Sequence, residues 1–146
     1  MLADMFPFGL VNLTPHDLTV YNEAGQVVAE IPRTGYKVRA ASETKEVQRI
    51  GGIPIYAEAL GKPTLEFPDG TTMEGDAIFI MMHIMSLDIF DGVLVNGLIM
   101  SRIAAEAMRR YGWHPQARPI LYVPGPLIRD SEGRVIGCQG LVKAAA

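Results

Sequence analysis

Three histidines and one cysteine are the residues of this sequence that could act as a general base or a nucleophile. An imidazole titrates near neutral pH, which makes it the usual general base in proteins. His16 precedes Asp17 in an expected bend, where hydrogen bonds to the backbone would give it a structural role. His83 lies inside a long apolar run and is expected in the core, and His114 follows Trp113 just past the expected helix. The histidine pattern therefore favours structural roles over catalysis.

Cys138 is the single cysteine, so the chain can form no internal disulfide. A thiol reacts as its thiolate, which needs a nearby cation or a helix N-terminus. Cys138 lies in a strand-like run away from any expected helix start, so we predict a small buried hydrophobic residue. The sequence has no Cys/His cluster at zinc-ligand spacing and no glycine-rich phosphate loop. We therefore expect neither a metal nor a cofactor.

The arginines give the more specific functional hypothesis. Nine arginines stand against four lysines in an acidic chain, and arginine is suited to bidentate recognition of phosphate or carboxylate. A coding bias or selection for thermal stability would enrich arginine equally well. If an anion site exists, it is predicted from the arginines at strand ends and turns, together with aromatic rings that could stack on a base: Arg33, Arg39, Arg129 and Arg134 with Tyr36 or Trp113.

Length and composition predict one globular domain. The chain has 146 residues, 49% of them hydrophobic, and a formal net charge of -3. The acidic balance argues against a dedicated nucleic-acid binder, which needs cations to neutralise phosphates. The N-terminus has no basic region and no long apolar run, so we expect no signal peptide, no membrane span and a cytoplasmic location. We divide the chain into an N-terminal extension, residues 1–9, and a single domain, residues 10–146.

Short apolar runs between glycine and proline turns predict a strand-rich domain. Turn residues separate the two strands of three expected hairpins, which are Leu18–Tyr21 with Gln26–Ile31, Thr64–Phe67 with Thr71–Glu74, and Leu127–Arg129 with Arg134–Cys138. Ile53–Leu60 is predicted as a further strand. Ser42–Glu46 has no apolar residue, so we expect it at an edge or in a loop.

Two segments are expected to form the core. Ala77–Met85 is the most apolar stretch and is predicted as a strand covered on both faces. Gly97–Tyr111 is predicted as the one principal helix, with Asn96 as its N-cap. Its buried face would include Leu98, Ile103, Ala107 and Met108. The predicted fold class is α+β, a mainly antiparallel twisted sheet with this helix packed on it.

The ordered motifs resemble those of small proteins encoded mainly by bacteriophages and prophages, for which no activity is established. The resemblance rests on the Asn-Leu-Thr-Pro-His motif at residues 12–16 and the Gly-Arg-Val-Ile-Gly-Cys motif at residues 133–138, with Ile31–Gly35 and Gly52–Ile55 between them. The chain departs from that pattern in its extension, Met1–Gly9, and in the longer apolar middle, Ile78–Phe90.

The resemblance implies a small protein acting in a host cytoplasm, and three functions remain open. The first is a non-enzymatic counter-defence protein that sequesters a small anionic host signal such as a cyclic nucleotide. The second is a protein inhibitor of a host enzyme such as RNA polymerase or a nuclease, which the methionine-rich run Met81–Met85 favours. The third is an enzyme acting on a nucleotide through His16 or Cys138. A homo-oligomer is also predicted, formed through Met5, Phe6, Phe8 and part of Ile84–Phe90.

Overall fold

Three parallel strands form the centre of the fold. In the computed structural model, which describes residues 5–144, they pair in the order β1 (Leu10–Asn12), β9 (Gly97–Ile99) and β10 (Ile120–Pro124). The fourth strand of this sheet, β13 (Leu141–Lys143), pairs with β10 in the antiparallel direction. The carboxyl ends of the three parallel strands therefore lie at the same edge of the sheet.

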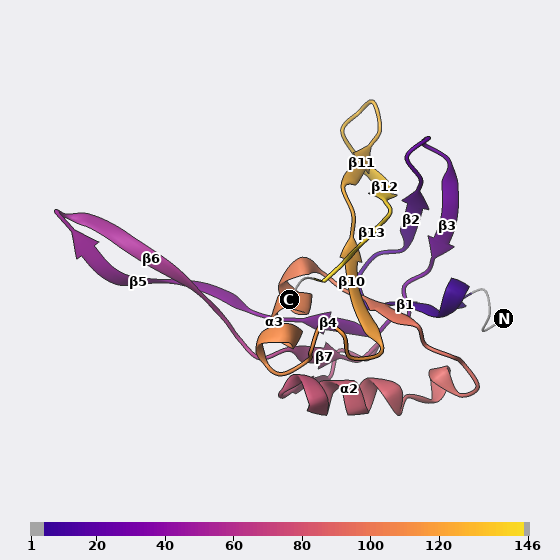
Figure 1. The fold of residues 1–146 in the computed structure, drawn as a ribbon, viewed down its shortest axis with the longest axis horizontal. Helices are drawn as coiled ribbons and strands as arrows, with labels where there is room; N and C mark the ends of the chain where they lie inside the picture. Colours follow the sequence, from indigo (N-terminus) through magenta and orange to yellow (C-terminus); the bar gives the residue numbers. More distant parts are fainter. Residues whose placement is uncertain (1–4, 145–146) are drawn as a thin grey trace.

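A second sheet joins two of the predicted hairpins. Its order is β11 (Leu127–Arg129), β12 (Val135–Gln139), β2 (Leu18–Tyr21) and β3 (Val27–Ile31). The β12–β2 pairing is parallel and joins the two antiparallel hairpins, which rise together at the top of Figure 1. Gly137 makes this close approach possible, because a Cβ there would lie 2.3 Å from the carbonyl oxygen of Thr19.

The remaining strands form a small sheet and a projecting arm. The small sheet contains β4 (Lys37–Arg39), β7 (Thr64–Glu66) and β8 (Thr72–Glu74), so the third predicted hairpin is confirmed. Between β4 and β7 the chain runs out and back as a two-stranded antiparallel ribbon, the β5–β6 arm, formed by β5 (Ser42–Ile50) and β6 (Ile53–Leu60). The arm points away from the body (Figure 1), and Ser42–Glu46 is exposed along its length, as an edge segment should be.

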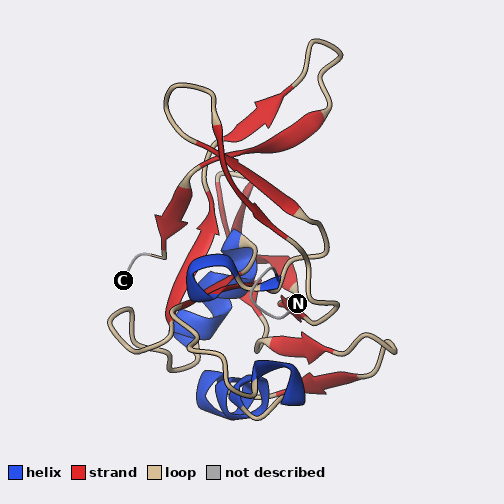
Figure 2. Cartoon of the chain, turned by 90° about the vertical axis from the view of Figure 1, so that its right-hand side faces the viewer, coloured by secondary structure: helices blue, strands red, loops and turns tan. Residues whose placement is uncertain are grey.

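The helices cover the core at the end away from the paired hairpins (Figure 2). Within residues 5–144 they are α2 (Ala77–Met85) and α3 (Arg102–Arg110), with short 3₁₀ turns at Pro7–Gly9 and Asp88–Phe90. Their buried residues pack with those of the parallel strands and the small sheet, including Val11, Leu98, Leu121, Val38 and Leu65. The α+β class predicted from the sequence is confirmed, with strands in antiparallel and mixed sheets.

The prediction of a strand at Ala77–Met85 is wrong, because this segment is helix α2. Its buried residues, Ala77, Ile80, Met81 and Ile84, follow the three- and four-residue steps of a helix face. The opposite face is also apolar: Ile78, Phe79, Met82 and Met85 are exposed. Apolar residues on both faces hid the helical period in the sequence. No helix in the described part of the chain is long and apolar enough to span a membrane.

The principal helix is also shorter than predicted. Residues 97–99 form β9, and α3 begins after Ser101, whose hydroxyl oxygen accepts a hydrogen bond from the Ala104 N–H at 3.2 Å. Ser101 is therefore the N-cap in place of Asn96. The later start changes the buried face: Ala107 and Met108 are buried as predicted, but Ile103 in the first turn is 42% exposed. Leu98 is buried on β9 and not on the helix.

The apolar residues assigned to an oligomer contact are mostly used inside the chain. Phe6 and Phe90 are buried and their rings meet edge to face, with centroids 5.4 Å apart. Ile84 is fully buried and Met5 is partly buried against the same core, whereas Phe8 is exposed. The core therefore already covers Phe6, Ile84 and Phe90 and leaves Phe8 exposed, and the homo-oligomer itself stays a prediction. Residues 1–4 of the predicted extension lie outside the described residues.

The revised helix face makes a stability prediction. Truncating the buried Met108 to Ala is expected to lower the free energy of unfolding by about 2 to 5 kcal/mol, because it leaves a cavity. Truncating the exposed Ile103 to Ala is expected to cost less than about 1 kcal/mol. Urea denaturation of both variants measures the difference, and equal losses would contradict the assigned face.

Candidate functional site

A groove lies where the parallel strands end. Thr14 follows β1, Ser101 follows β9, and Pro124 ends β10, and all three line a groove of about 560 Å³. Open sheets with parallel strands commonly bind ligands outside the carboxyl ends of their strands. The opposite wall is the β11–β12 hairpin of the second sheet. We call this hollow the carboxyl-end groove.

The lining of the carboxyl-end groove is mostly apolar, with a few polar groups. Apolar side chains come from both walls: Pro15, Leu18, Pro124, Leu127, Val135 and Ile136. The polar residues are Thr14, His16, Asp17 and Ser101, and the backbone of Gly137 and the Cys138 side chain complete the surface. Size and lining match the small-molecule sites of proteins, which are concave and apolar with a few polar groups that fix orientation.

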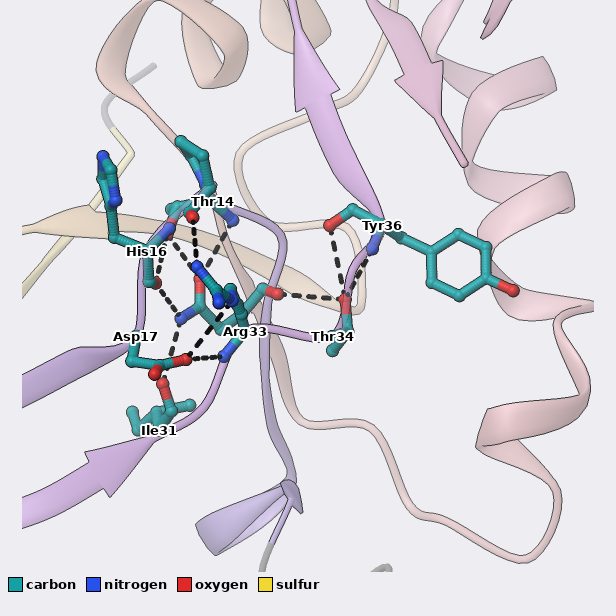
Figure 3. A network of polar contacts seen from close by, with 9 residues as sticks. Thr14, His16, Asp17, Ile31, Arg33, Thr34 and Tyr36 are labelled. Carbon is teal, nitrogen blue, oxygen red and sulfur yellow. Dashed lines mark hydrogen bonds and ion pairs between the residues drawn. The ribbon is translucent and has the colours of Figure 1, made fainter. Parts of the chain in front are cut away.

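A buried amide holds the loop that forms one side of the groove. Asn12 is fully buried, and its Nδ2 donates to the carbonyl oxygens of His16 at 2.8 Å and Ile31 at 3.0 Å. Its Oδ1 accepts from the Thr14 N–H at 2.9 Å and from the Thr14 hydroxyl at 2.6 Å. Figure 3 draws the contacts of this network together with Thr14, His16 and Ile31. The Asn-Leu-Thr-Pro-His motif is therefore a structural device that closes the loop on its own backbone.

Asp17 and Arg33 contact each other on the outer side of the same loop, residues 13–17. The Asp17 Oδ1 accepts from the Arg33 N–H at 2.9 Å and lies 3.9 Å from the Arg33 Nε. The guanidinium Nη1 also donates to the Pro15 carbonyl oxygen at 3.4 Å. On the next residue, the Thr34 hydroxyl oxygen lies 3.2 Å from the Asn12 carbonyl oxygen. Arg33, one of the predicted ligand arginines, thus contacts the loop backbone (Figure 3).

His16 and Ser101, the N-cap of α3, are two of the polar residues that line the groove. The His16 side chain is exposed and points away from the Asn12 network (Figure 3). Ser101 caps α3, whose N-terminus carries a partial positive charge from its peptide dipoles. An anionic group of a ligand would find its favourable environment at this end of the groove.

Cys138 is a wall residue without nucleophilic character. It is 1% exposed and packs with Val20, Ile31 and Ile99 in a second core cluster. Burial raises the pKa of the thiol above its ordinary value of 9.0, against a smaller opposite effect of a hydrogen bond from the Gly125 backbone. The thiol therefore stays protonated at neutral pH, as the prediction of a small buried hydrophobic residue implied.

Of the other predicted arginines, Arg129 and Arg134 share the β11–β12 turn, whereas Arg39 lies in the small sheet. Arg39 lies 3.7 Å from the Glu66 carboxylate at the end of β4. Arg129 donates to the Gly133 carbonyl oxygen at 2.8 Å inside the β11–β12 turn. Arg134 of the same turn pairs with Asp130 at 3.0 Å and with Glu132 at 2.9 Å. The backbone N–H of Arg134 is the main reason that the pKa of Asp130 is lowered.

The two predicted aromatic residues serve local packing. The Tyr36 ring meets Phe67 edge to face, with centroids 5.7 Å apart. The Trp113 Nε1 donates to the Pro119 carbonyl oxygen at 3.2 Å and its side chain packs on the main core. The carboxyl-end groove is lined by none of the six predicted residues. The structure therefore brings together a different set from the one that residue type suggested.

A smaller hollow of about 210 Å³ gathers other cationic side chains. Arg102 and Arg109 of α3 line it with Lys143 of β13 and with Glu106, which itself pairs with Arg110 at 3.0 Å. Arg102 and Arg109 are not among the arginines at strand ends and turns from which the sequence predicted an anion site. Among residues 5–144, the structure has no group of three or more His, Cys, Asp or Glu side chains that could hold a metal ion.

Sequence reasoning missed Asn12, Ser101 and the apolar wall of the groove. A signal for Asn12 was present, because an amide at the end of an apolar strand followed by Thr and Pro is typical of a side chain that caps a turn. No comparable local signal predicts the wall, since Leu127 and Ile136 come from a hairpin more than a hundred residues further along the chain.

No family model, curated protein or solved structure matches this chain. The resemblance to small phage proteins therefore stays a prediction.

The hydrogen bonds of the buried Asn12 side chain lead to a prediction with a matched control. Asn12→Ala is expected to lower the free energy of unfolding by about 3 kcal/mol or more, because buried partner groups on Thr14 and Ile31 lose their hydrogen bonds. Asn22 is the control, since its side chain also bonds the Ala24 and Gln26 N–H groups, at 2.9 and 3.0 Å, but in an exposed turn. Asn22→Ala is expected to cost about 1 kcal/mol, because water replaces the lost bonds. Similar losses by chemical denaturation would refute the role given to Asn12.

The buried thiol makes a prediction about pH. The folded state keeps Cys138 protonated above the pH at which the unfolded thiol ionises, so the unfolded state binds fewer protons there. The thiol is therefore expected to destabilise the fold increasingly as pH rises past about 9. Denaturation of wild type and Cys138→Ala at pH 7 and pH 10 isolates this effect. The stability of the variant relative to wild type should rise between the two values, and a constant difference would contradict the prediction.

Proposed function

We propose that this protein is a non-enzymatic binding protein that holds a small, ring-bearing anionic ligand in the carboxyl-end groove. The observation that supports this most directly is the groove itself, which has about 560 Å³ of space at the ends of three parallel strands. Its titratable lining residues favour binding over catalysis: an exposed imidazole, a carboxylate engaged with Arg33, and a buried protonated thiol.

The groove offers separate places for the two parts of such a ligand. A flat ring would lie between Leu18 on one side and Leu127 and Val135 on the other. The anionic group would lie toward Ser101 at the positive end of α3, with His16 available as a further donor. This arrangement replaces the cluster of arginines that we predicted from the sequence.

The biological role that we propose is sequestration. A protein that binds a nucleotide-like signal tightly lowers the free concentration of that signal without any chemical step. Together with the resemblance to phage proteins, this suggests a counter-defence protein acting in a host cytoplasm, with a cyclic nucleotide as its ligand.

The test is a thermal-shift titration of the full chain with adenosine, adenosine monophosphate, cyclic adenosine monophosphate and a cyclic dinucleotide. A ligand present at a hundred times its Kd is expected to raise Tm by roughly 5 to 10 °C. Leu127→Asp should abolish the shift, because it places a carboxylate on the wall beside the ring. Leu94→Asp is the control, since Leu94 is exposed and lies outside the groove lining. The absence of a shift with all four probes would contradict this function.

Arginine variants then locate the ligand. Arg129→Ala is expected to leave the shift unchanged, because that guanidinium bonds its own turn. Arg109→Ala is expected to do the same, since Arg109 lines the smaller hollow. If Arg109→Ala abolishes the shift and Leu127→Asp does not, the ligand binds in the smaller hollow.

A second candidate function is inhibition of a host enzyme by direct binding. The outward face of α2 favours it, because Met82 is 67% exposed and Ile78 is 57% exposed beside it. Flexible methionine side chains suit adaptable protein contacts. If this function holds, the wild type will inhibit transcription by purified bacterial RNA polymerase, or cleavage by a purified nuclease, and Met82→Glu will not.

A further inference from the structure

The two faces of the β5–β6 arm differ in their share of polar residues. Side chains of directly paired residues lie on the same face of an antiparallel ribbon. The pairs Ser42↔Leu60, Thr44↔Glu58, Glu46↔Tyr56 and Arg49↔Pro54 define a mainly polar face. On this face Glu46 pairs with Arg49 at 2.8 Å, and the Ser42 hydroxyl contacts Glu58.

The opposite face carries an apolar strip. It is defined by the pairs Glu43↔Ala59, Lys45↔Ala57, Gln48↔Ile55 and Ile50↔Ile53, with Val47 as the extra residue of a β-bulge beside it. Ile50 and Ile53 are 59% and 63% exposed, and both alanines are exposed. We call this strip the apolar arm face.

The arm needs a covering layer to be stable. A two-stranded ribbon alone in water is marginally stable at best. The nine residues of β5 span roughly 30 Å, and Figure 1 shows the outer part of the arm well away from the helices and the other sheets. Burying the apolar arm face against another surface would supply the missing layer.

Charge on the apolar arm face suits a second copy of the same face. Glu43 and Lys45 are its ionised residues, and they pair with each other at 3.4 Å. The face therefore has no net charge, so two copies do not repel one another. An interface with two-fold symmetry requires a surface complementary to itself, which a strongly charged strip could not provide.

Side-chain size along the arm also suits an antiparallel meeting of two copies. The half near the tip carries the large residues Ile50, Ile53 and Ile55, and the half near the body carries Ala57 and Ala59 beside the paired Lys45 and Glu43. When two arms overlap in opposite directions, the isoleucines of one lie over the alanines of the other. Large residues facing small ones allow close packing between the layers.

We propose that the apolar arm face is the contact between two copies of this chain, packed face to face with the arms antiparallel about a two-fold axis. The homo-oligomer predicted from the sequence then forms through the arm, and not through the N-terminal and Ile84–Phe90 segments. This proposal is independent of any ligand in the carboxyl-end groove.

Sedimentation velocity of the full chain over a range of concentrations tests the proposal. A species of twice the 15.9 kDa chain mass is expected at micromolar concentration. Ile53→Glu should raise the dissociation constant of the dimer by about a hundredfold or more, because it buries a charge in the contact. Tyr56→Glu is the matched control on the polar face, where Tyr56 is 59% exposed, and it should leave the dimer intact. Far-UV circular dichroism confirms that both variants fold.

A cysteine pair tests the orientation. Ala57 lies near the middle of the strip, so the two copies of Ala57→Cys should lie close to the two-fold axis on facing layers about 10 Å apart, where a short bis-maleimide cross-linker can join them. Tyr56→Cys, one residue away on the opposite face, should not cross-link. A monomeric wild type, a dimer that survives Ile53→Glu, or equal cross-linking of both cysteine variants would overturn the proposal.

Discussion

The buried amide of Asn12 connects the parts of the molecule that must stay in register. Its acceptor side fixes Thr14, and its donor side reaches the end of the loop at His16 and the end of β3 at Ile31. A buried side chain with every hydrogen-bonding group satisfied stabilises one arrangement and penalises the alternatives. Because β1 belongs to the parallel sheet and β3 to the hairpin sheet, this amide sets how the two sheets meet. The shape of the groove between the two sheets therefore depends on the hydrogen bonds of Asn12.

Local sequence signals predicted the hairpins because the information for a hairpin is local. The Asx and glycine residues at the β2–β3, β7–β8 and β11–β12 turns bond their own backbone, as the Asn22 and Asp130 contacts show. The prediction of a strand at Ala77–Met85, the segment that forms α2, failed for a different reason. The outward face of α2 is as apolar as its inward face, so the period that distinguishes helix from strand was absent from the sequence.

Residue type was a poor guide to the site because the same side chain serves several purposes. The sequence could show that Asp130 lies in the same turn as Arg134, but not that Asp17 lies opposite Arg33. The groove depends instead on contacts of long sequence separation, such as the parallel pairing of Cys138 with Val20. No local pattern encodes such a pairing, since it arises when separate hairpins assemble on the same core.

The groove and the second core cluster share residues, which ties binding to folding. Cys138 lines the groove and packs on Val20, Ile31 and Ile99, and Ile31 also accepts the Asn12 hydrogen bond. A small displacement of β12 away from β2 would widen the groove and, at the same time, expose this core cluster to solvent. Packed interiors resist such displacements because each void costs dispersion contacts. The part of the groove at Cys138 is therefore held by packed core residues before any ligand arrives, which lowers the free energy that a ligand spends on ordering the protein.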